Sequence, residues 1–310
     1  MRRMKRFLRR LPSYALAILT AAGAPALAAD AVAVVIGEEG AAHAEVAARI
    51  RSRLEPAVKV SLHRTADVAP GPGEARLLVA VGAKAAARLA IARDNTPLLV
   101  TLLPQEAFER LAADSRSRGS TRPLSAVYLD QPVGRQLDLL RLAVPKARRI
   151  GVLLGTEAGS GFNALSAAAI ERALDLKVRR IARPDELAAE LQALLPETDL
   201  LLAVPDASVF NAGTIQMILL SAYRRQQPLV GFSAAYTRAG ALVSLHSTPA
   251  QIGEQAADMI DAALARGALP PPQHPRQFVV TTNPHVAHSL GIPIESEDAL
   301  LRRLQAIEAR

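Results

Sequence analysis

The chain has 310 residues, no cysteine and a formal net charge of +8. Without cysteine it forms neither disulfides nor thiolate metal sites, and its 50% hydrophobic content is ample for one or two buried cores. The first residues hold six of the 37 basic side chains and no acidic one, so the rest of the chain carries a net charge of only +2. Aromatic residues make up 3% of the chain, and no basic cluster with interleaved aromatics remains, which argues against a nucleic-acid partner.

Residues 1–28 have the pattern of an export signal. Basic residues from Arg2 to Arg10 precede an apolar run from Tyr14 to Gly23, and a string of small residues follows. About ten apolar residues are too few to cross roughly 30 Å of hydrocarbon as a membrane anchor. We therefore predict a signal peptide cleaved after Ala28, or alternatively after Ala29, and a periplasmic mature protein.

Strand-like apolar runs then alternate with helical patterns at the spacing of βαβ units. In the first half we expect strands at 31–36, 58–62, 77–81 and 97–103, and helices at 41–54 and 83–92. The polar segment 114–123 contains glycine and proline and lacks periodicity, so it predicts an exposed connection into a second half.

The second half repeats the alternation. We expect strands at 126–129, 150–154, 178–181, 200–204, 228–231 and 241–245, and helices at 134–143, 161–174, 184–195, 212–225 and 234–238. A long amphipathic helix at 250–266 and a proline-stiffened linker at 267–275 lead to a strand at 278–282 and closing helices at 284–290 and 297–309.

This order predicts an α/β fold with two Rossmann-like lobes, mainly parallel sheets and an interlobe cleft. Parallel sheets present ligand sites at the carboxyl ends of their strands, so two such halves joined by several crossings face a common cleft. We expect lobe 1 to comprise residues 29–123 with about 246–283, and lobe 2 to comprise 124–245 with about 284–310.

Two stretches, 204–211 and 228–240, stand out as candidate site segments. In each, an apolar strand-like run ends abruptly in small and polar residues that open a helical pattern. Hydroxyl groups, an amide and helix N-terminal N–H groups are thereby brought to one edge of the sheet, which is how an open α/β sheet builds a small-molecule site.

Over nearly all of its length after residue 28, the chain resembles the substrate-binding proteins of ABC transporters, in the branch related to tryptophan- and tyrosine-binding proteins. The resemblance depends on the order and spacing of the two stretches above and of residues 81–86, 130–140, 145–154, 239–243, 280–283 and 287–292. It implies the type I periplasmic-binding fold, a small-molecule ligand between the lobes, an inner-membrane ABC permease as partner, a monomeric state and no cofactor.

The resemblance also implies ligand-binding residues at the strand–helix turns. In lobe 1 these are Gly82, Ala83 and Thr101, and in lobe 2 they are Thr156, Ser160, Phe162, Asn163, Asp206, Ser208, Phe210, Asn211, Ser233 and Tyr236. The segment 159–163 departs from the ending expected for an amino-acid α-carboxylate, so amino-acid specificity does not carry over.

Several of these residues have a structural alternative. Asp206 contacts a ligand amine or hydroxyl, or instead caps the next helix or organises its turn, and Asn211 is the better N-cap candidate. Phe162, Phe210, Phe232 and Tyr236 all fall at strand–helix turns, which favours a cleft lining over the core. A ligand with an apolar or aromatic portion and at least one polar group fits this set.

An enzyme remains as the competing hypothesis. Residues 231–235 approach the Gly-x-Ser-x-Gly elbow around Ser233, and Asp258 or Asp261 with His285 or His288 would complete a serine esterase in hydrolase order. The second glycine of the elbow is replaced by Ala235, so we predict a binding protein without catalytic residues. A ligand-sensing module that serves a receptor is a further alternative. The six histidines are too scattered for a metal site.

Overall fold

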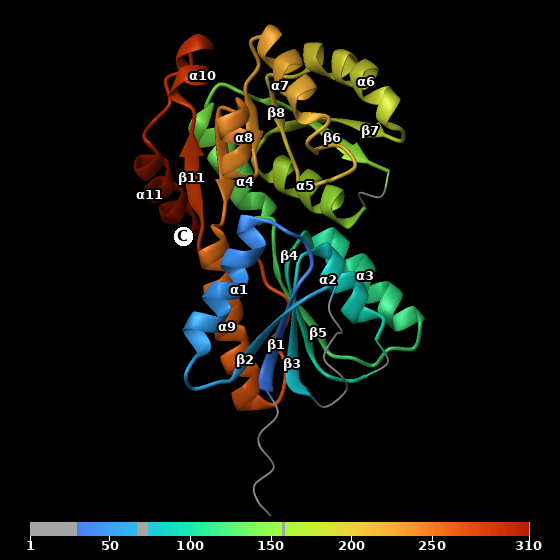
Figure 1. Cartoon of the computed structure of the whole chain (residues 1–310). Coiled ribbons are helices and arrows are strands. Elements are labelled where there is room, and N and C mark those ends of the chain that lie inside the picture. The colour runs from blue at the N-terminus through green and yellow to red at the C-terminus, as the bar shows by residue number, and fades with distance from the viewer. Residues whose placement is uncertain (1–29, 67–73, 93, 157–158, 310) are drawn as a thin grey trace, which may run out of the picture.

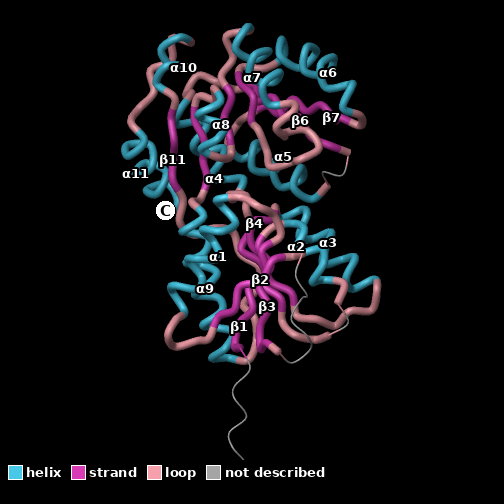
Figure 2. The backbone as a smooth tube through the Cα atoms, in the orientation of Figure 1, coloured by secondary structure: helices cyan, strands magenta, loops and turns pink. Residues whose placement is uncertain are grey.

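The computed structural model describes residues 30–66, 74–92, 94–156 and 159–309, and the predicted signal peptide lies outside these ranges. The described chain forms two lobes, one above the other in Figure 1, and each is built around its own β-sheet. Strands lie at the centre of each lobe and helices lie outside them (Figure 2). We call the lobe that holds β1 to β5 lobe 1 and the lobe that holds β6 to β11 lobe 2.

Lobe 1 has a parallel sheet with strand order β2-β1-β3-β4-β5. Its strands are β1 (Asp30–Ile36), β2 (Val60–Arg64), β3 (Ala75–Val81), β4 (Leu98–Leu103) and β5 (Leu124–Tyr128). Helices α1 (Ala41–Leu54) and α9 (Pro249–Arg266) cover one face, and α2 (Ala83–Ala90) and α3 (Gln105–Ser117) cover the other. Because both faces are covered, the inner strands β1, β3 and β4 are nearly continuous apolar runs.

Lobe 2 has the strand order β11-β10-β9-β8-β6-β7, parallel except that β11 runs antiparallel to β10. The strands are β6 (Arg149–Gly155), β7 (Asp175–Ile181), β8 (Leu200–Leu202), β9 (Leu229–Gly231), β10 (Val243–His246) and β11 (Val279–Thr282). One face packs against α4 (Val133–Ala143), α5 (Ser160–Glu171), α10 (Pro284–Ser289) and α11 (Glu297–Glu308), and the other against α6 (Leu187–Leu194), α7 (Ile215–Arg224) and α8 (Ala234–Ala239). The predicted fold class is confirmed.

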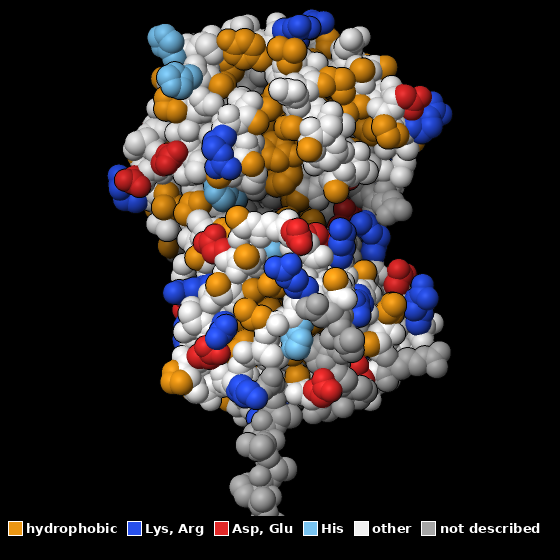
Figure 3. Space-filling view, in the orientation of Figure 1, with side chains coloured by type: hydrophobic (Ala, Val, Ile, Leu, Met, Phe, Trp, Pro, Cys, Tyr) orange, Lys and Arg blue, Asp and Glu red, His pale blue; other side chains and the backbone are white. Residues whose placement is uncertain are grey.

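The chain passes between the lobes at three places: from β5 to α4, from β10 to α9, and from the segment after α9 to β11. The third passage is tied to lobe 1 before it leaves, because Gln273 exchanges backbone hydrogen bonds with Ala126 and Tyr128 at 2.9 Å each. The connecting segments therefore lie side by side at the waist between the lobes, where the molecular surface narrows (Figure 3).

Local signals in the sequence fix the ends of α9, the helix that returns the chain to lobe 1. Thr248 and Gln251 form a reciprocal capping box at its start, with Pro249 as the first helical residue. Gly267 ends the helix at φ 74°, in the left-handed region that glycine adopts without strain. None of the helices in the described ranges combines the length and apolar character needed to span a bilayer.

Two strands lie in a different lobe from the one that the sequence indicated. The strand expected at 126–129 was assigned to the second half, but β5 pairs with β4 in the first sheet. The strand at 278–282 was placed with lobe 1, but β11 pairs with β10. Both errors have one cause: strand patterns show where a strand lies along the chain and not which neighbour it pairs with.

Two helices also differ from the prediction. No helix was expected between the strand at 97–103 and the connection at 114–123, but α3 spans Gln105–Ser117, with Phe108, Ala112 and Ser115 as its buried stripe. The helix expected to begin at Ala212 begins at Ile215, after a turn whose side-chain bonds centre on Asn211.

Candidate functional site

A cavity of about 400 Å³ lies between the two lobes. Its walls come from the end of β4 and the start of α3 in lobe 1, from the first connecting segment and α4, and from α5 and the turns after β6 and β8 in lobe 2. His274, in the third connecting segment, completes the lining. The cavity therefore opens where carboxyl ends of strands from both sheets meet, as expected for a ligand site in this architecture.

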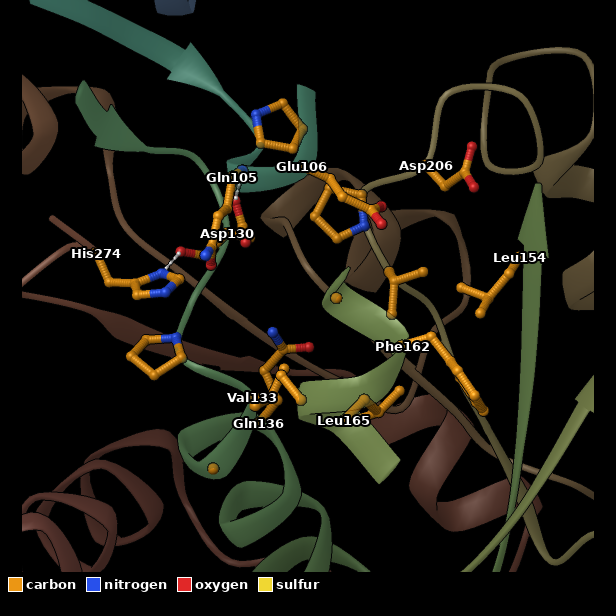
Figure 4. A pocket seen from close by; sticks show the side chains of 17 residues that line it. Gln105, Glu106, Asp130, Val133, Gln136, Leu154, Phe162, Leu165, Asp206 and His274 are labelled. Carbon is orange, nitrogen blue, oxygen red and sulfur yellow. Dashed lines mark hydrogen bonds between the residues drawn. The ribbon is translucent and has the colours of Figure 1, made fainter. Parts of the chain in front are cut away.

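One side of the cavity is apolar. Leu154 is the last but one residue of β6, Phe162 and Leu165 lie in the first turns of α5, and Val204 follows β8. Leu154 and Leu165 belong to the core of lobe 2, with Phe162 and Val204 packed against it, so the wall is an extension of that core. Figure 4 shows Leu154 and Phe162 on one side of the cavity and Gln105, Asp130 and His274 on the other.

Asp130 is one of three acidic groups that line the cavity. It follows β5, and its Oδ1 accepts a hydrogen bond of 2.7 Å from the backbone N–H of Gln105 at the start of α3. Its backbone carbonyl lies 3.0 Å from Nδ1 of His274 (Figure 4). Burial raises the pKa of the Asp130 carboxyl, although the Gln105 bond and the nearby His274 oppose that shift. A buried carboxylate of this kind is stabilised by a positive group placed beside it.

Asp206 organises the turn after β8 and also lines the cavity. Its Oδ2 accepts from the backbone N–H of Gly155 at 2.7 Å, and its Oδ1 accepts from the backbone N–H and the hydroxyl of Ser208 at 3.0 and 2.5 Å. The carboxylate thus joins the ends of β6 and β8. The sequence left three roles open for Asp206: a ligand contact, a helix cap or the organiser of its turn. These hydrogen bonds show that it organises the turn.

Glu106 links the two lobes across the cavity mouth. It lies in the first turn of α3 in lobe 1, and its Oε1 accepts a hydrogen bond from the backbone N–H of Gly159, which precedes α5 in lobe 2. Helices α3 and α5 also contact each other. The carboxylate therefore lies at the N-terminal ends of two helices, where backbone N–H groups favour negative charge.

Of the residues predicted from the sequence, the structure places Phe162 and Asp206 in the cavity lining. In lobe 1, Gly82 precedes α2 and Ala83 begins it, while Thr101 is fully buried and donates to the carbonyl of Ala80 at 3.3 Å. None of these three lobe 1 residues is part of the described lining.

Three of the four aromatic residues expected to line the cleft, Phe210, Phe232 and Tyr236, instead form a cluster of their own. The ring centroids of Phe232 and Tyr236 are 4.5 Å apart, and those of Phe210 and Phe232 are 6.5 Å apart. The cluster packs on the core beneath α6 and α7, and burial raises the pKa of Tyr236 to about 12. Only Phe162 of the four aromatics is among the described lining residues.

The remaining predicted residues are polar groups at turns. Ser208 bonds to Asp206, Asn211 accepts from the backbone N–H of Gly213, and Ser233 is the N-cap residue of α8. Thr156 and Asn163 are exposed, and Ser160 begins α5. Their role in ligand binding stays a prediction.

Sequence reasoning passed over Gln105, Glu106, Asp130, Gln136 and His274 as ligand-binding residues. Glu106 and Asp130 obey the strand-end rule used elsewhere, because they follow β4 and β5. Gln136 lies within a helix, and His274 lies in a proline-rich linker, so no local pattern marks either as a lining residue.

The structure separates the residues of the esterase hypothesis. Asp258 and Asp261 lie on α9 in lobe 1, where both pair with Arg53, while Ser233 lies at the start of α8 in lobe 2. No described hydrogen bond or ion pair joins them. Within the described ranges, no three histidine or acidic side chains group as metal ligands.

The fold and cavity define a class: a two-lobed α/β binding protein of the type I periplasmic-binding architecture, with its ligand site between the lobes. The sequence matches the family model described as ABC transporter substrate binding protein over residues 72–305, and the chain belongs to that family. The resemblance stated from the sequence is thereby confirmed.

Solved structures share this fold. A domain from Streptococcus pneumoniae in complex with L-Trp is 18% identical with a TM-score of 0.63, and the match covers 87% of this chain and 98% of that one. A conserved domain protein from Vibrio cholerae is 22% identical with a TM-score of 0.64, covering 88% and 97%. The ligand-free, open substrate-binding protein from Clostridium difficile is 15% identical with a TM-score of 0.64, covering 86% and 96%. No curated protein sequence matched the chain.

Proposed function

We propose that this protein is an exported solute-binding protein that captures a small organic molecule in the interlobe cavity and delivers it to an inner-membrane ABC permease. The observation that carries the proposal is the cavity of about 400 Å³, which both lobes line and which has an apolar wall with few polar groups. Cavities of this size and composition hold small ligands. Family membership supports the transport role, and the basic and apolar pattern of residues 1–28 supports export to the periplasm.

The ligand combines an apolar or aromatic portion with at least one polar group. Phe162 and Leu154 offer a surface for the apolar portion, and Asp130 and Asp206 offer polar contacts. In structures of the same fold, the Streptococcus pneumoniae domain is in complex with L-Trp, and a solute-binding protein from Agrobacterium vitis is bound with α-D-tagatopyranose. Both ligands are small organic molecules, as proposed for this chain.

Ligand binding is coupled to closure of the lobes. A molecule that touches both walls of the cavity binds the closed arrangement more tightly than the open one, so it shifts the population toward closure. The hydrogen bond from Gly159 in lobe 2 to Glu106 in lobe 1 also stabilises the closed arrangement when no ligand is bound. We further propose that the protein acts as a monomer and without catalysis; the receptor-sensing alternative is less favoured, because the matched family consists of transporter components.

A thermal-shift screen over amino acids, aromatic acids, amines, nucleobases and sugars tests the proposal. A compound that binds only the native state raises the melting temperature in a saturable way. X-ray scattering with that compound should then show a smaller radius of gyration than without it. Absence of any saturable shift across the screen, together with unchanged scattering profiles, would contradict a solute-binding role.

A further inference from the structure

The polar groups around the cavity share one hydrogen-bonding character. The described lining includes three carboxylates, Glu106, Asp130 and Asp206, and neither lysine nor arginine. Carboxylates accept hydrogen bonds and donate none when ionised. The remaining polar side chains of the lining are Gln105, Gln136 and His274, and their own contacts decide whether they present donors or acceptors to a ligand.

Gln136 presents an acceptor. Its side chain is 7% exposed, and its Nε2 donates to the backbone carbonyl of Gln131 at 2.8 Å. A carbonyl accepts only from the NH₂ end of an amide, so this bond fixes the orientation of the side chain. Oε1 is left without a hydrogen bond from the described residues, in a side chain that lines the cavity. This amide oxygen is not among the buried unpartnered atoms, so it is accessible in the cavity and can accept a hydrogen bond from a ligand donor.

Gln105 also presents an acceptor, and the contact of His274 shows which of its ring nitrogens carries the hydrogen. The Nε2 of Gln105 donates to Glu109 at 2.7 Å, which leaves its Oε1 as the free end of the amide. Nδ1 of His274 lies 3.0 Å from the carbonyl of Asp130, and since a carbonyl only accepts, Nδ1 carries the hydrogen. Nε2 then accepts a hydrogen bond when the ring is neutral and donates one when the ring is protonated.

The position that an anionic ligand group would take is already filled. The start of α5 faces the cavity, and a helix N-terminus is the natural site for a carboxylate. Here Glu106 accepts the N–H of Gly159 at that place, and a Cβ on Gly161 would lie 3.6 Å from its carboxyl carbon. A ligand carboxylate would have to displace Glu106 or lie beside its charge.

We propose that the cavity takes an organic cation: a compound with a protonated amine beside Asp130, an apolar body against Phe162 and Leu154, and no carboxylate. The amine donates to the Asp130 carboxylate and to the oxygen of Gln136, so a charged and a neutral acceptor bind the same group. This inference rests on the proposed solute-binding function and specifies its ligand class.

Matched compounds test the inference by isothermal titration calorimetry on the purified protein. One series is phenethylamine, phenylalanine and 3-phenylpropionate, and the other is tryptamine, tryptophan and indole-3-propionate. Within each series the amine should bind at least about tenfold more tightly than the two carboxylates, a difference that one unfavourable charge contact supplies. A carboxylate that binds as tightly as its amine overturns the inference and leaves the solute-binding function intact.

If none of the six compounds binds, the inference is tested by the charge of any compound that the broader thermal-shift screen identifies. A cation supports the inference, and a neutral or anionic compound overturns it. Failure of every compound in both experiments contradicts the solute-binding function itself, and the inference with it.

Two variants separate a charge effect from a loss of folding. Asp130→Asn keeps the acceptor for Gln105 and should weaken amine binding roughly 30-fold or more, because one partner of a buried charge pair is lost. Asp114→Asn, an exposed position on the same helix as Gln105, should leave the affinity unchanged. Equal amine affinity for wild type and Asp130→Asn, with both folded by circular dichroism, overturns the inference.

Glu106→Ala gives a test in the opposite direction. Removing this carboxylate frees the N–H of Gly159 and should improve the affinity for 3-phenylpropionate relative to phenethylamine by about tenfold. A merely structural role of Glu106 would lower both affinities together. An unchanged ratio therefore counts against the proposed exclusion of carboxylates.

Discussion

Gln131 donates a hydrogen bond from Nε2 to the hydroxyl of Ser247 at 2.9 Å, and this bond joins two of the three segments that connect the lobes. Ser247 in turn donates to the backbone carbonyl of Gln277 in the third segment at 2.5 Å. The three segments are thus linked in series beside the cavity. In the lobe closure proposed above, these mutual bonds hold the three segments together as one hinge.

We predict that Gln131→Ala lowers the free energy of unfolding by about 1–3 kcal/mol, the cost of losing a buried amide and leaving its partners unsatisfied. Gln131 is 3% exposed, and its Oε1 also accepts from Arg135 at 2.6 Å. Urea denaturation measures the loss. Ser247→Ala should cost less, and the double variant should show a coupling of roughly 0.5–1.5 kcal/mol. Strictly additive effects would show that the bond contributes nothing.

A second prediction concerns the loss of stability in the unliganded protein when the buried Asp130 carboxyl ionises. Burial raises the pKa of the Asp130 carboxyl above the ordinary value of 3.8. At a pH between these two values, the carboxyl is protonated in the folded protein and ionised in the unfolded chain. Between the ordinary and the raised pKa, stability from this group falls as pH rises. Asp130→Asn removes the desolvated charge and should make the unliganded protein more stable at neutral pH.

The pH dependence distinguishes this cause from a packing effect. The stability difference between Asp130→Asn and wild type should be small near the ordinary pKa, grow with pH through that window, and stay constant above it. Denaturation curves at several pH values from about 3 to 8 provide the comparison. A difference that does not vary with pH, or a variant that is less stable at neutral pH, would contradict the assignment.

The sequence predicted the strands because those buried on both faces are continuous apolar runs, as in residues 31–36 and 77–81. It predicted most helices as well, but not α3. It did not predict which lobe receives β5 and β11. Those strands are paired by contacts with β4 and β10, which are distant from them in the chain or separated by a connecting helix. Pairing is decided by tertiary packing, and period and composition carry no record of it.

The site was less accessible to prediction for a similar reason. Phe162 and Phe210 have the same local setting, each near the start of a helix that follows a strand, yet Phe162 lines the cavity and Phe210 is 6% exposed within the lobe 2 core. Which face of the turn meets the other lobe depends on how the lobes dock. His274 shows the limit most clearly, because three connecting segments must come together before it borders the cavity.

The third prediction addresses Asp206. Asp206→Ala should lower the free energy of unfolding by about 1–3 kcal/mol, because the buried N–H of Gly155 loses its acceptor. Ser208→Ala should cost under about 1 kcal/mol, since Ser208 is exposed and water replaces its bonds to Asp206. Thermal and urea unfolding of both variants provide the values. Equal costs for the two substitutions would show that the turn, and not the Gly155 bond, carries the effect.

A fourth prediction concerns Arg135, which fastens the C-terminal helix to the hinge. Its Nε donates to Glu308 at 2.5 Å, its Nη1 donates to the carbonyl of Pro275 at 2.9 Å, and its guanidinium lies 4.1 Å from the ring centroid of Phe278. Arg135→Ala should cost about 2–6 kcal/mol, because the Oε1 of Gln131 and the carbonyl of Pro275 each lose a donor at about 1–3 kcal/mol.

Glu308→Ala serves as the matched comparison for that prediction. The guanidinium keeps its carbonyl and amide acceptors in this variant, so the loss should stay near 1 kcal/mol, as for a hydrogen bond to a partly exposed group. Calorimetric or urea unfolding provides both numbers. A larger loss in Glu308→Ala than in Arg135→Ala would place the stabilisation in α11 itself instead of the arginine.

The last prediction separates the two kinds of aromatic residue. Phe162→Ala removes part of the apolar wall of the cavity and should weaken ligand binding by about 1–3 kcal/mol, the transfer free energy of a buried aromatic side chain. Phe210→Ala should instead cost about 3–5 kcal/mol of stability, because it leaves a void in the lobe 2 core beside Phe232 and Tyr236. Its affinity, measured by titration below its melting temperature, should stay near that of wild type. The reverse outcome, strong binding loss in Phe210→Ala and none in Phe162→Ala, would move the ligand from the cavity beside α5 to the aromatic cluster at α8.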